Sequence, residues 1–282
     1  MKSIFSSLVR RAFTGTSPAT RAVQGLASAL MAMGVITAGS ASAATFVSSE
    51  LALSVDVSAS VNSTEFNLQR DGYEAAFRDA GLIGQIESLT GGIAASLQYW
   101  SDSATQSTAW FHITDATSSN LFADAIAAAA RPSSSSIGFG TNIADGIDFA
   151  ANSLLTNAFD GKRLIIDVSG DGRQNRDCGG NCIGRLQTSR DNALAQGIAI
   201  NGLPILTDRP NLDNYFASNV VGGPDSFLVA ANDFDAFAQA VKTKIGREIA
   251  PPQSVPEPGM LIGLAAVSLL GFGAKKRQKD LT

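Results

Sequence analysis

Histidine and cysteine are almost absent from this chain of 282 residues, which contains one histidine and two cysteines. A zinc site would need more ligands of these types, and the histidine, His112, is not near the cysteines in sequence. The HExxH motif of zinc peptidases and the GxSxG motif of serine hydrolases are both missing. These absences favour a binding protein over an enzyme, and we expect His112 to have a structural role.

Basic residues are scarce between the two ends of the chain. Eight of the 21 lysines and arginines and two of the 25 aspartates and glutamates lie in the two ends, so residues 44–255 contain 13 basic and 23 acidic residues. Nucleic-acid binding depends on basic side chains, so a charge near −10 argues against a nucleic-acid partner. The same charge is compatible with cation binding and with solubility outside the cell.

No apolar run reaches the roughly 20 residues that a membrane-spanning helix needs, but each end carries a shorter run. Residues 1–43 contain four basic residues, no acidic residue, an apolar stretch from about Leu26 to Gly39 and the small residues Ala41-Ser42-Ala43. This order predicts a secretory signal peptide, with an N-terminal membrane anchor as the alternative.

The other end combines a Pro-Glu-Pro motif, an apolar run and a basic tail. Residues 251–258 form a predicted linker that ends in Pro256-Glu257-Pro258, and residues 259–282 hold the apolar run and the basic cluster. This order resembles the PEP-CTERM sorting signal. The resemblance implies an exosortase-type processing enzyme as partner, transient membrane association through the apolar helix, removal of that helix, and a location in the cell envelope or outside the cell. A permanent C-terminal anchor is the alternative, with its basic end on the cytoplasmic side.

Residues 44–250 alternate strand-like apolar runs with segments of helical periodicity, which predicts one α/β domain with a mostly parallel sheet covered by helices. The predicted strands are 51–57, 91–101, 107–113, 163–172, 198–206 and 226–230. The link between the second and third is too short for a crossover helix, so this pair should be antiparallel. The predicted helices begin at Asn62 and at residues 120, 141, 185 and 233, and residues 132–140 are a predicted loop.

Apolar periodicity predicts which helical residues face the core. These residues are Phe66, Tyr73, Ala76, Phe77, Ile143, Ile147, Ala151, Leu154, Phe234, Phe237, Ala238, Val241 and Ile245. We also expect the aromatic residues Trp100, Trp110 and Phe111 to belong to the core or to a sheet face rather than to a sugar-binding platform.

Five oxygen-bearing residues follow strands or begin a helix where a parallel sheet usually places its ligand site. Asp56, Ser58 and Ser60 alternate at the end of the first strand, Thr141 begins a helix, and Asp171 lies at the end of the apolar run predicted at 163–172. Two carboxylates and three hydroxyls form a hard-oxygen set that suits Mg²⁺ or Mn²⁺, with Ca²⁺ also possible. Because hydroxyls are neutral ligands, such a site keeps positive charge and can accept an anionic group from a partner.

Other readings of these residues stay open. Asp56 could cap a helix while Ser58 and Ser60 form a turn. Asp167 could replace Asp171 as the second acidic ligand, although we expect it to be a hydrogen-bonded acid at the strand end.

Residues near this set have weaker signals. Asp145 and Asp148 should lie on the polar face of a helix, and Asn175 could support the site. Cys178 and Cys182 stand close together in DCGGNC, and in an exported protein we expect them to form a disulfide. We expect the loop that this disulfide closes to shape the rim of the site.

The spacing Asp56-x-Ser58-x-Ser60, a later Thr141 and a later Asp171 resembles the metal-ion-dependent adhesion site of von Willebrand factor A domains. More closely, SGDGRQN, RDNALAQGIAINGLPIL and KTKIGREI look like the DUF1194 branch of these exported bacterial proteins, over about residues 48–250. The resemblance implies a doubly wound, mostly parallel sheet with one antiparallel edge strand and helices on both faces.

The resulting expectation is an exported binding module that uses its metal ion to hold an acidic group of a protein or polysaccharide partner. One alternative is a structural matrix protein that uses no metal. The other is a metal-dependent hydrolase, for which the sequence offers no clear base or nucleophile.

Overall fold

The computed structural model describes residues 43–207 and 209–250. The predicted Pro-Glu-Pro linker and sorting helix therefore lie outside the described residues. So does the predicted signal peptide, except for its last residue, Ala43. Within 43–207 and 209–250, no helix is both long enough and apolar enough to cross a membrane.

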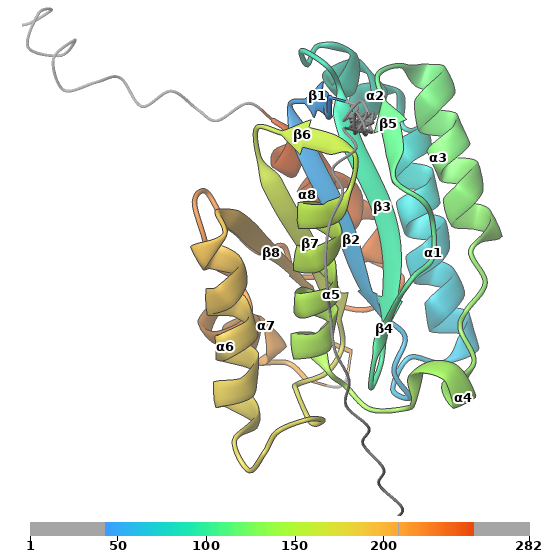
Figure 1. The fold of residues 1–282 in the computed structure, drawn as a ribbon. Coiled ribbons are helices and arrows are strands. Elements are labelled where there is room, and N and C mark those ends of the chain that lie inside the picture. Colours follow the sequence, from blue (N-terminus) through green and yellow to red (C-terminus); the bar gives the residue numbers. More distant parts are fainter. Residues whose placement is uncertain (1–42, 208, 251–282) are drawn as a thin grey trace, which may run out of the picture. The chain divides into compact units, whose positions relative to one another are not determined.

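The main sheet has six strands, and its order is β4-β3-β2-β7-β8 with β5 also paired to β3 (Figure 1). The strands are β2 (Ser49–Asp56), β3 (Ile93–Trp100), β4 (Ala104–Gln106), β5 (Phe111–Ile113), β7 (Leu164–Gly170) and β8 (Ile198–Pro204). β3, β2, β7 and β8 are parallel, whereas β4 and β5 pair with β3 in the antiparallel direction. The predicted parallel sheet with an antiparallel edge is confirmed.

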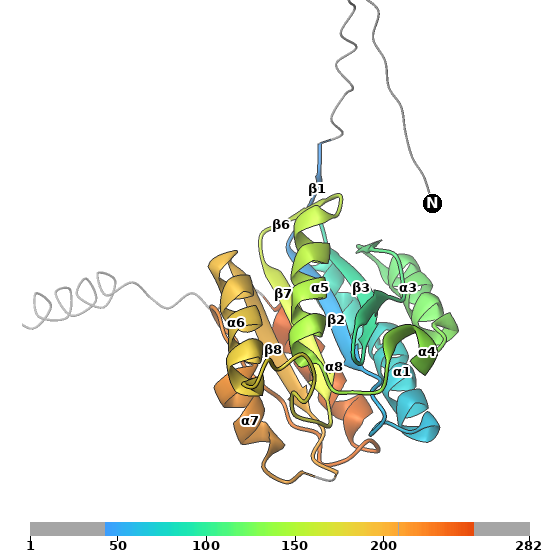
Figure 2. The same ribbon diagram turned by 60° about the horizontal axis from the view of Figure 1, so that its bottom comes forward.

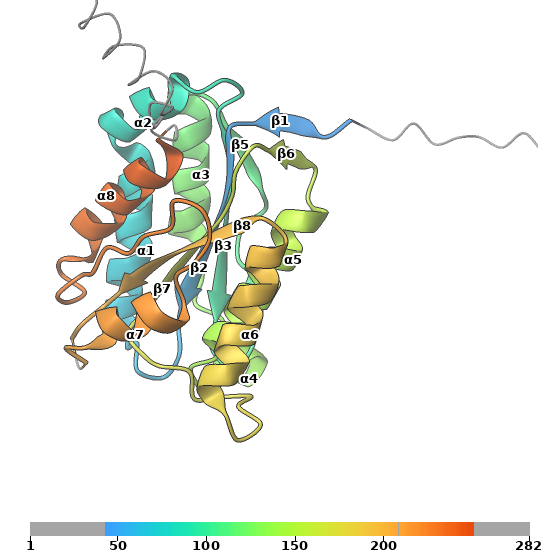
Figure 3. The ribbon, with the colours of Figure 1, turned by 90° about the vertical axis from the view of Figure 1, so that its left-hand side faces the viewer.

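Helices cover both faces of this sheet, as Figure 3 shows from the side. One group packs together on one face and comprises α1 (Ser63–Arg78), α2 (Ala80–Glu87), α3 (Ala116–Ala128) and α8 (Phe237–Ile249). A second group comprises α5 (Ile143–Thr156), α6 (Cys182–Ala195) and α7 (Leu212–Asn219), with α7 packed on β8 and α6. Every residue of β2 and β3 is buried, which is the expected result for parallel strands covered on both sides.

Side-chain alternation along β2 distributes the core between the two faces. Leu51, Leu53 and Val55 pack with α1, α3 and α8, while Ala52 packs with α5. A separate two-stranded parallel sheet joins β1 (Thr45–Val47) to β6 (Phe159–Gly161). The short helix α4 (Ser134–Ile137) lies near the start of α1, at the lower edge of the sheet in Figure 1 (Figures 1 and 2).

Several predicted elements differ from the structure. α3 begins at Ala116, four residues before the predicted start, because Asp115 and Ser118 form a capping box there. Residues 226–230 form only isolated bridges to the edge of β8, not a strand. The predicted loop at 132–140 contains α4, and α2, α7, β1, β4 and β6 were not predicted as separate elements.

Four of the five residues predicted for the apolar stripe of the last helix, Phe234, Phe237, Val241 and Ile245, are buried, and Ala238 is the exception. Ala238 is exposed, and Ala240 is buried in its place. Two charged residues of α8, Lys244 and Glu248, are fully buried on the same side as Val241. Apolar periodicity could not identify these two buried charges, because it counts apolar residues alone.

Asp167 is the partner of one of these buried charges. It lies within β7 and is fully buried on the α8 side, where Lys244 Nζ is 2.6 Å from Asp167 Oδ1 and 2.5 Å from Glu248 Oε1. Asn201 Nδ2 on β8 donates to Glu248 Oε1 at 3.0 Å, and the Tyr73 hydroxyl on α1 lies 3.4 Å from Asp167 Oδ1. Asp167 is thus an ion-paired residue in the middle of a strand, and not the acid at the strand end that the sequence suggested.

Candidate metal site

The five oxygen-bearing residues lie at one edge of the sheet because β2 and β7 are adjacent and parallel. Asp56 is the last residue of β2, and Ser58 and Ser60 lie in the loop between β2 and α1. Asp171 directly follows β7, and Thr141 lies just before α5. The fold thus gathers residues separated by up to 115 positions in the sequence.

The loop after β2 is short because α1 begins immediately behind it. The predicted capping box is present: Thr64 N and Glu65 N donate to Asn62 Oδ1 at 2.8 and 3.1 Å, and Asn62 N donates to Glu65 Oε2 at 2.7 Å. These bonds satisfy the first N–H groups of the helix. The N-terminus of α1 is therefore fixed close to Ser60, because its N-cap residue, Asn62, lies only two positions further along the chain.

Hydrogen bonds connect the five residues. Ser60 Oγ donates to Asp171 Oδ1 at 2.7 Å, Ser58 Oγ and Ser60 Oγ are 3.1 Å apart, and Thr141 Oγ1 donates to Ser58 Oγ at 3.5 Å. Ser58 N donates to Asp56 Oδ1 at 2.8 Å. The side chains therefore surround a common point instead of pointing in separate directions.

The charges of this cluster are not balanced within it. Asp56 is fully buried, and its Oδ2 atom has no hydrogen-bond partner in the described part of the chain. Burial, and next the charge of Asp171, raise the pKa of Asp56 to about 8, while hydrogen bonds from Ser58 and from the backbone of Asp171 oppose this rise. A divalent cation would satisfy the unpaired oxygen and offset the repulsion between the two carboxylates, so the residues fit such an ion.

Two glycines allow the site to be compact. A Cβ atom on Gly170 would lie 2.9 Å from Asp56 Oδ2 and 3.3 Å from Trp100 Cη2. A Cβ atom on Gly172 would lie 3.1 Å from both Thr141 Oγ1 and Thr141 Cγ2. Larger residues at these positions would push the side chains of the cluster apart.

Asn175 holds Thr141 by a reciprocal pair of bonds. Thr141 N donates to Asn175 Oδ1 at 2.9 Å, and Asn175 N donates to Thr141 O at 2.9 Å. The neighbouring Gln174 is buried, and its side chain accepts from Ala144 N at 3.0 Å and donates to Asn142 Oδ1 at 2.6 Å. The segment after Asp171 therefore fixes the start of α5, which supports the idea that Asn175 assists the site.

Sequence reasoning missed three further residues that support this edge. Arg131 Nη2 donates to the carbonyl oxygens of Val57, Ser58 and Val61 at 2.9, 3.1 and 2.6 Å. Asp102 Oδ1 accepts from Gly140 N at 2.6 Å and from Arg176 Nε at 2.8 Å, and Gln69 Nε2 donates to Asp56 O at 3.1 Å. Asp102 follows the end of β3, so the strand-end rule could have identified it, whereas Arg131 and Gln69 carry no sequence signal.

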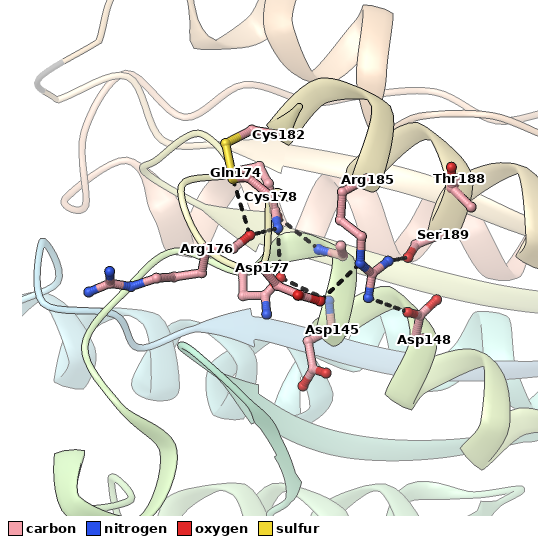
Figure 4. Close-up of polar contacts among 12 residues, drawn as sticks. Asp145, Asp148, Gln174, Arg176, Asp177, Cys178, Cys182, Arg185, Thr188 and Ser189 are labelled. Carbon is pink, nitrogen blue, oxygen red and sulfur yellow. Dashed lines mark hydrogen bonds and ion pairs between the residues drawn. A yellow bond between two sulfur atoms is a disulfide. The ribbon is translucent and has the colours of Figure 1, made fainter. Parts of the chain in front are cut away.

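Cys178 and Cys182 are joined by a disulfide, and the loop they close directly follows Arg176 and Asp177 (Figure 4). Arg185 on α6 donates to Asp148 Oδ2 at 2.9 Å and to Asp177 Oδ2 at 3.1 Å (Figure 4). One arginine therefore connects the loop to α5. The expected influence of the loop on the rim of the site remains a prediction.

The remaining residues that the sequence singled out have structural contacts. Asp145 Oδ2 accepts from Ala104 N at 2.7 Å, so this acid links α5 to β4. His112 Nε2 is 2.8 Å from Gly91 O, and His112 pairs with Ala94 near the start of β3, whereas the cluster lies where β2 ends. Trp100 is fully buried, and Trp110 and Phe111 are half-buried against the core.

Within residues 43–207 and 209–250, no three His, Cys, Asp or Glu side chains form a group that could hold a metal ion. The candidate site differs from such groups in having two carboxylates and three hydroxyls. Its recognition therefore depends on the alternating serines and on the threonine as much as on the acids.

Comparison with solved structures shows that this α/β fold occurs in other proteins. The pilus adhesin SpaC from Lactobacillus rhamnosus GG is 13% identical with a TM-score of 0.51, over 71% of this chain and 30% of SpaC. Proximal thread matrix protein 1 from the mussel byssus, with a zinc-occupied MIDAS motif, is 15% identical with a TM-score of 0.48, over 73% of this chain and 46% of its own. The conserved hypothetical protein BatB from Bacteroides thetaiotaomicron is 16% identical with a TM-score of 0.46, over 70% of this chain and 97% of BatB. The chain thus spans less than half the length of SpaC and of the byssus protein.

The family is shown by the sequence itself. Residues 46–253 match the family described as protein of unknown function (DUF1194), and the chain belongs to that family. Residues 254–278 match the PEP-CTERM protein-sorting motif. A search of curated proteins gave no significant match.

Proposed function

We propose that this protein is an exported binding module that holds a divalent cation, Mg²⁺ or Mn²⁺, and uses it to bind an acidic group of a partner. The observation that carries the proposal is the fully buried Asp56 Oδ2, which has no hydrogen-bond partner among residues 43–207 and 209–250 and lies near Asp171 and three hydroxyls. Asp56, Ser58, Ser60, Thr141 and Asp171 would hold the ion.

The donor set explains why a partner would be needed. Only two of the five residues carry negative charge. They would balance the charge of a divalent ion without exceeding it, so the ion could still attract a carboxylate. Ser60 is exposed while Asp56 is buried, which leaves the outer side of the group open to solvent. A carboxylate on a protein or on an acidic polysaccharide has the required charge.

The proposal includes no catalytic reaction. His112 lies near the opposite end of β3, and the side chains around the candidate site, Ser58, Ser60, Thr141 and Asn175, are engaged in hydrogen bonds with one another or with the backbone. Activation of water would need a base beside the ion. Binding without turnover is therefore the function that this geometry supports best.

Export and sorting belong to the same proposal. The match to the PEP-CTERM motif supports sorting to the cell envelope through an exosortase-type enzyme. The acidic balance of residues 44–255 and the disulfide between Cys178 and Cys182 both suit a protein that works outside the cytoplasm.

Calorimetric titration of Mg²⁺ and Mn²⁺ into metal-stripped protein tests the proposal. Saturable binding should occur in the wild type and be lost in Asp56→Ala and in Asp171→Ala. Asp191→Ala is the matched control, because Asp191 is an exposed acid on α6 whose ion-pair partner in the described part of the chain is its neighbour Arg190. Absence of binding by folded wild-type protein would contradict metal use and favour a structural matrix role.

A further inference from the structure

A pocket of about 450 Å³ opens directly beside the candidate metal site. One wall is the loop after β2, which also carries Ser58 and Ser60, and the other is the segment that contains α4. We call it the side pocket, and its main lining residues are Val57, Val61, Arg131, Pro132, Ile137 and Phe139. None of the five metal-site residues lines the side pocket, but its lining residues Val57 and Val61 belong to the same loop, so a ligand that extends from the metal site across this loop would reach it.

The backbone of the side pocket is already hydrogen-bonded internally. Ala59 N donates to Phe139 O at 2.9 Å, Val61 N donates to Ser58 O at 3.1 Å, and Ile137 N donates to Ser133 O at 3.2 Å. The carbonyl groups of Val57 and Val61 accept from Arg131. Sugar hydroxyls would therefore find few free backbone partners, whereas an apolar side chain needs none.

The exposed part of the wall combines one large apolar side chain, Phe139, with the polar residues Asn62, Ser63 and Ser134. The Phe139 side chain is 61% exposed, and Pro132 is half-buried beside it. Ile137 is buried at the base between them. A large exposed aromatic residue next to an apolar hollow gains burial when a partner's apolar side chain covers it.

Arg131 gives the side pocket a positive charge. Its three acceptors are neutral carbonyl oxygens, and in the described part of the chain it forms no ion pair with a carboxylate. Its Nε and Nη1 atoms likewise have no hydrogen-bond partner among the described residues. In a domain with a charge near −10, this uncompensated guanidinium favours a ligand of negative charge.

We infer that the side pocket selects an acidic peptide segment, in which one carboxylate reaches the metal site and a neighbouring apolar side chain enters the pocket. The inference rests on the proposed metal-dependent binding and specifies its partner class. It assigns the apolar contact to Phe139, Pro132 and Ile137, and the attraction for the segment's negative charge to Arg131.

The test uses a phage-displayed library of seven-residue peptides with a fixed central aspartate, selected on the full-length protein in Mg²⁺. We expect one position beside the aspartate to be enriched in aliphatic or aromatic residues. Selected peptides should lose binding in EDTA and when their aspartate is replaced by asparagine. Replacing the enriched residue by glycine should weaken binding about tenfold or more.

Two substitutions locate the binding of that residue. Ser134 lines the side pocket, is exposed and makes no side-chain hydrogen bond among the described residues, so Ser134→Trp fills the pocket without touching the metal residues. It should weaken the selected peptides about tenfold. Ser135→Trp, next to it on α4 but outside the pocket lining, should have little effect. Phe139→Ala should give a smaller loss, and equal melting temperatures would show that all three variants fold.

The outcomes separate this inference from the proposed function. Magnesium-dependent binding through the aspartate without any preference beside it, or without an effect of Ser134→Trp, would overturn the side pocket and leave the metal function intact. Binding of polygalacturonate in Mg²⁺ with no peptide selected would overturn the peptide class alone. Failure of the calorimetric Mg²⁺ titration, together with no selected peptide, would overturn both.

Discussion

The buried charges under α8 predict an unusual pH dependence of stability. Lys244 is a single cation between two carboxylates, Asp167 and Glu248, and all three side chains are fully buried. When both carboxylates are ionised the cluster carries a net negative charge, because Lys244 balances only one of them. Glu248 Oε2 and Asp167 Oδ2 also have no hydrogen-bond partner among the described residues. Protonation of one carboxyl removes the excess charge.

The size of the effect follows from Glu248. Burial, and next the charge of Asp167, raise its pKa from 4.5 to about 7. A carboxyl whose pKa is raised on folding contributes its stability below the pKa of the unfolded chain and loses it as the pH rises through the folded pKa. At about 1.4 kcal/mol per pH unit, the free energy of unfolding should fall by about 3 kcal/mol between pH 4.5 and pH 7 through this group.

Glu248→Gln should remove this part of the pH dependence. The glutamine keeps an oxygen that can accept from Lys244 and Asn201, and it resembles the protonated acid. At pH 5 the variant should be more stable than the wild type by about 1 kcal/mol, and at pH 8 by about 3 kcal/mol. Urea unfolding of both proteins in EDTA at pH 5, 6, 7 and 8 measures the difference.

Comparing two proteins under the same conditions cancels the titration of Asp56 and of other shared groups. Glu87→Gln, an exposed glutamate at the end of α2, is the matched control and should follow the wild type. The reasoning is refuted if Glu248→Gln keeps the wild-type slope between pH 5 and 8, or if it is less stable than the wild type at pH 8.

Three further predictions concern packing, support of the site and the disulfide loop. A Cβ on Gly72 would lie 2.9 Å from Phe237 Cδ1, whereas nothing lies within 4 Å of one on Gly84. Urea unfolding should show that Gly72→Ala lowers the free energy of unfolding by about 1–3 kcal/mol and that Gly84→Ala raises it by about 0.5–1 kcal/mol. Equal effects would contradict the packing argument. Asn175→Ala should weaken Mg²⁺ binding about tenfold in calorimetry, because Thr141 N loses its acceptor; Asn175→Asp keeps an acceptor and should bind Mg²⁺ as the wild type does. Replacing Cys178 and Cys182 together by serine should cost at most about 2 kcal/mol, because the closed loop is short, and unchanged stability and metal affinity would argue against a role for the loop at the rim.

Local signals in the sequence were sufficient for much of the architecture. The capping box of Asn62 and Glu65 forms as predicted, because it depends on residues three positions apart. The short link between β3 and β5 leaves no room for a crossover helix, so the antiparallel edge is also confirmed. The start of α3 also depends on a local signal, the capping box of Asp115 and Ser118, which the apolar periodicity alone did not reveal. By contrast, the absence of a strand at 226–230 depended on pairing with β8, which the local pattern does not contain.

The candidate site could be predicted in its residue types but not in its support. Asp56, Ser58, Ser60, Thr141 and Asp171 carry a spaced pattern, and the fold gathers them at one edge of the sheet. Arg131 contacts this loop from about 70 positions away. No periodicity or turn signal marks a guanidinium whose partners are three backbone carbonyls.

The sequence by itself determined the class of fold and the position of oxygen ligands at strand ends, because strand, turn and cap preferences act over a few residues. Only the tertiary structure decided which of two acids four residues apart joins the candidate site. Asp171 lies beyond the end of β7 beside Ser60, whereas Asp167 points from within the strand toward Lys244. A buried charge is stable only with a partner, and α8 supplies that partner from a distant part of the chain.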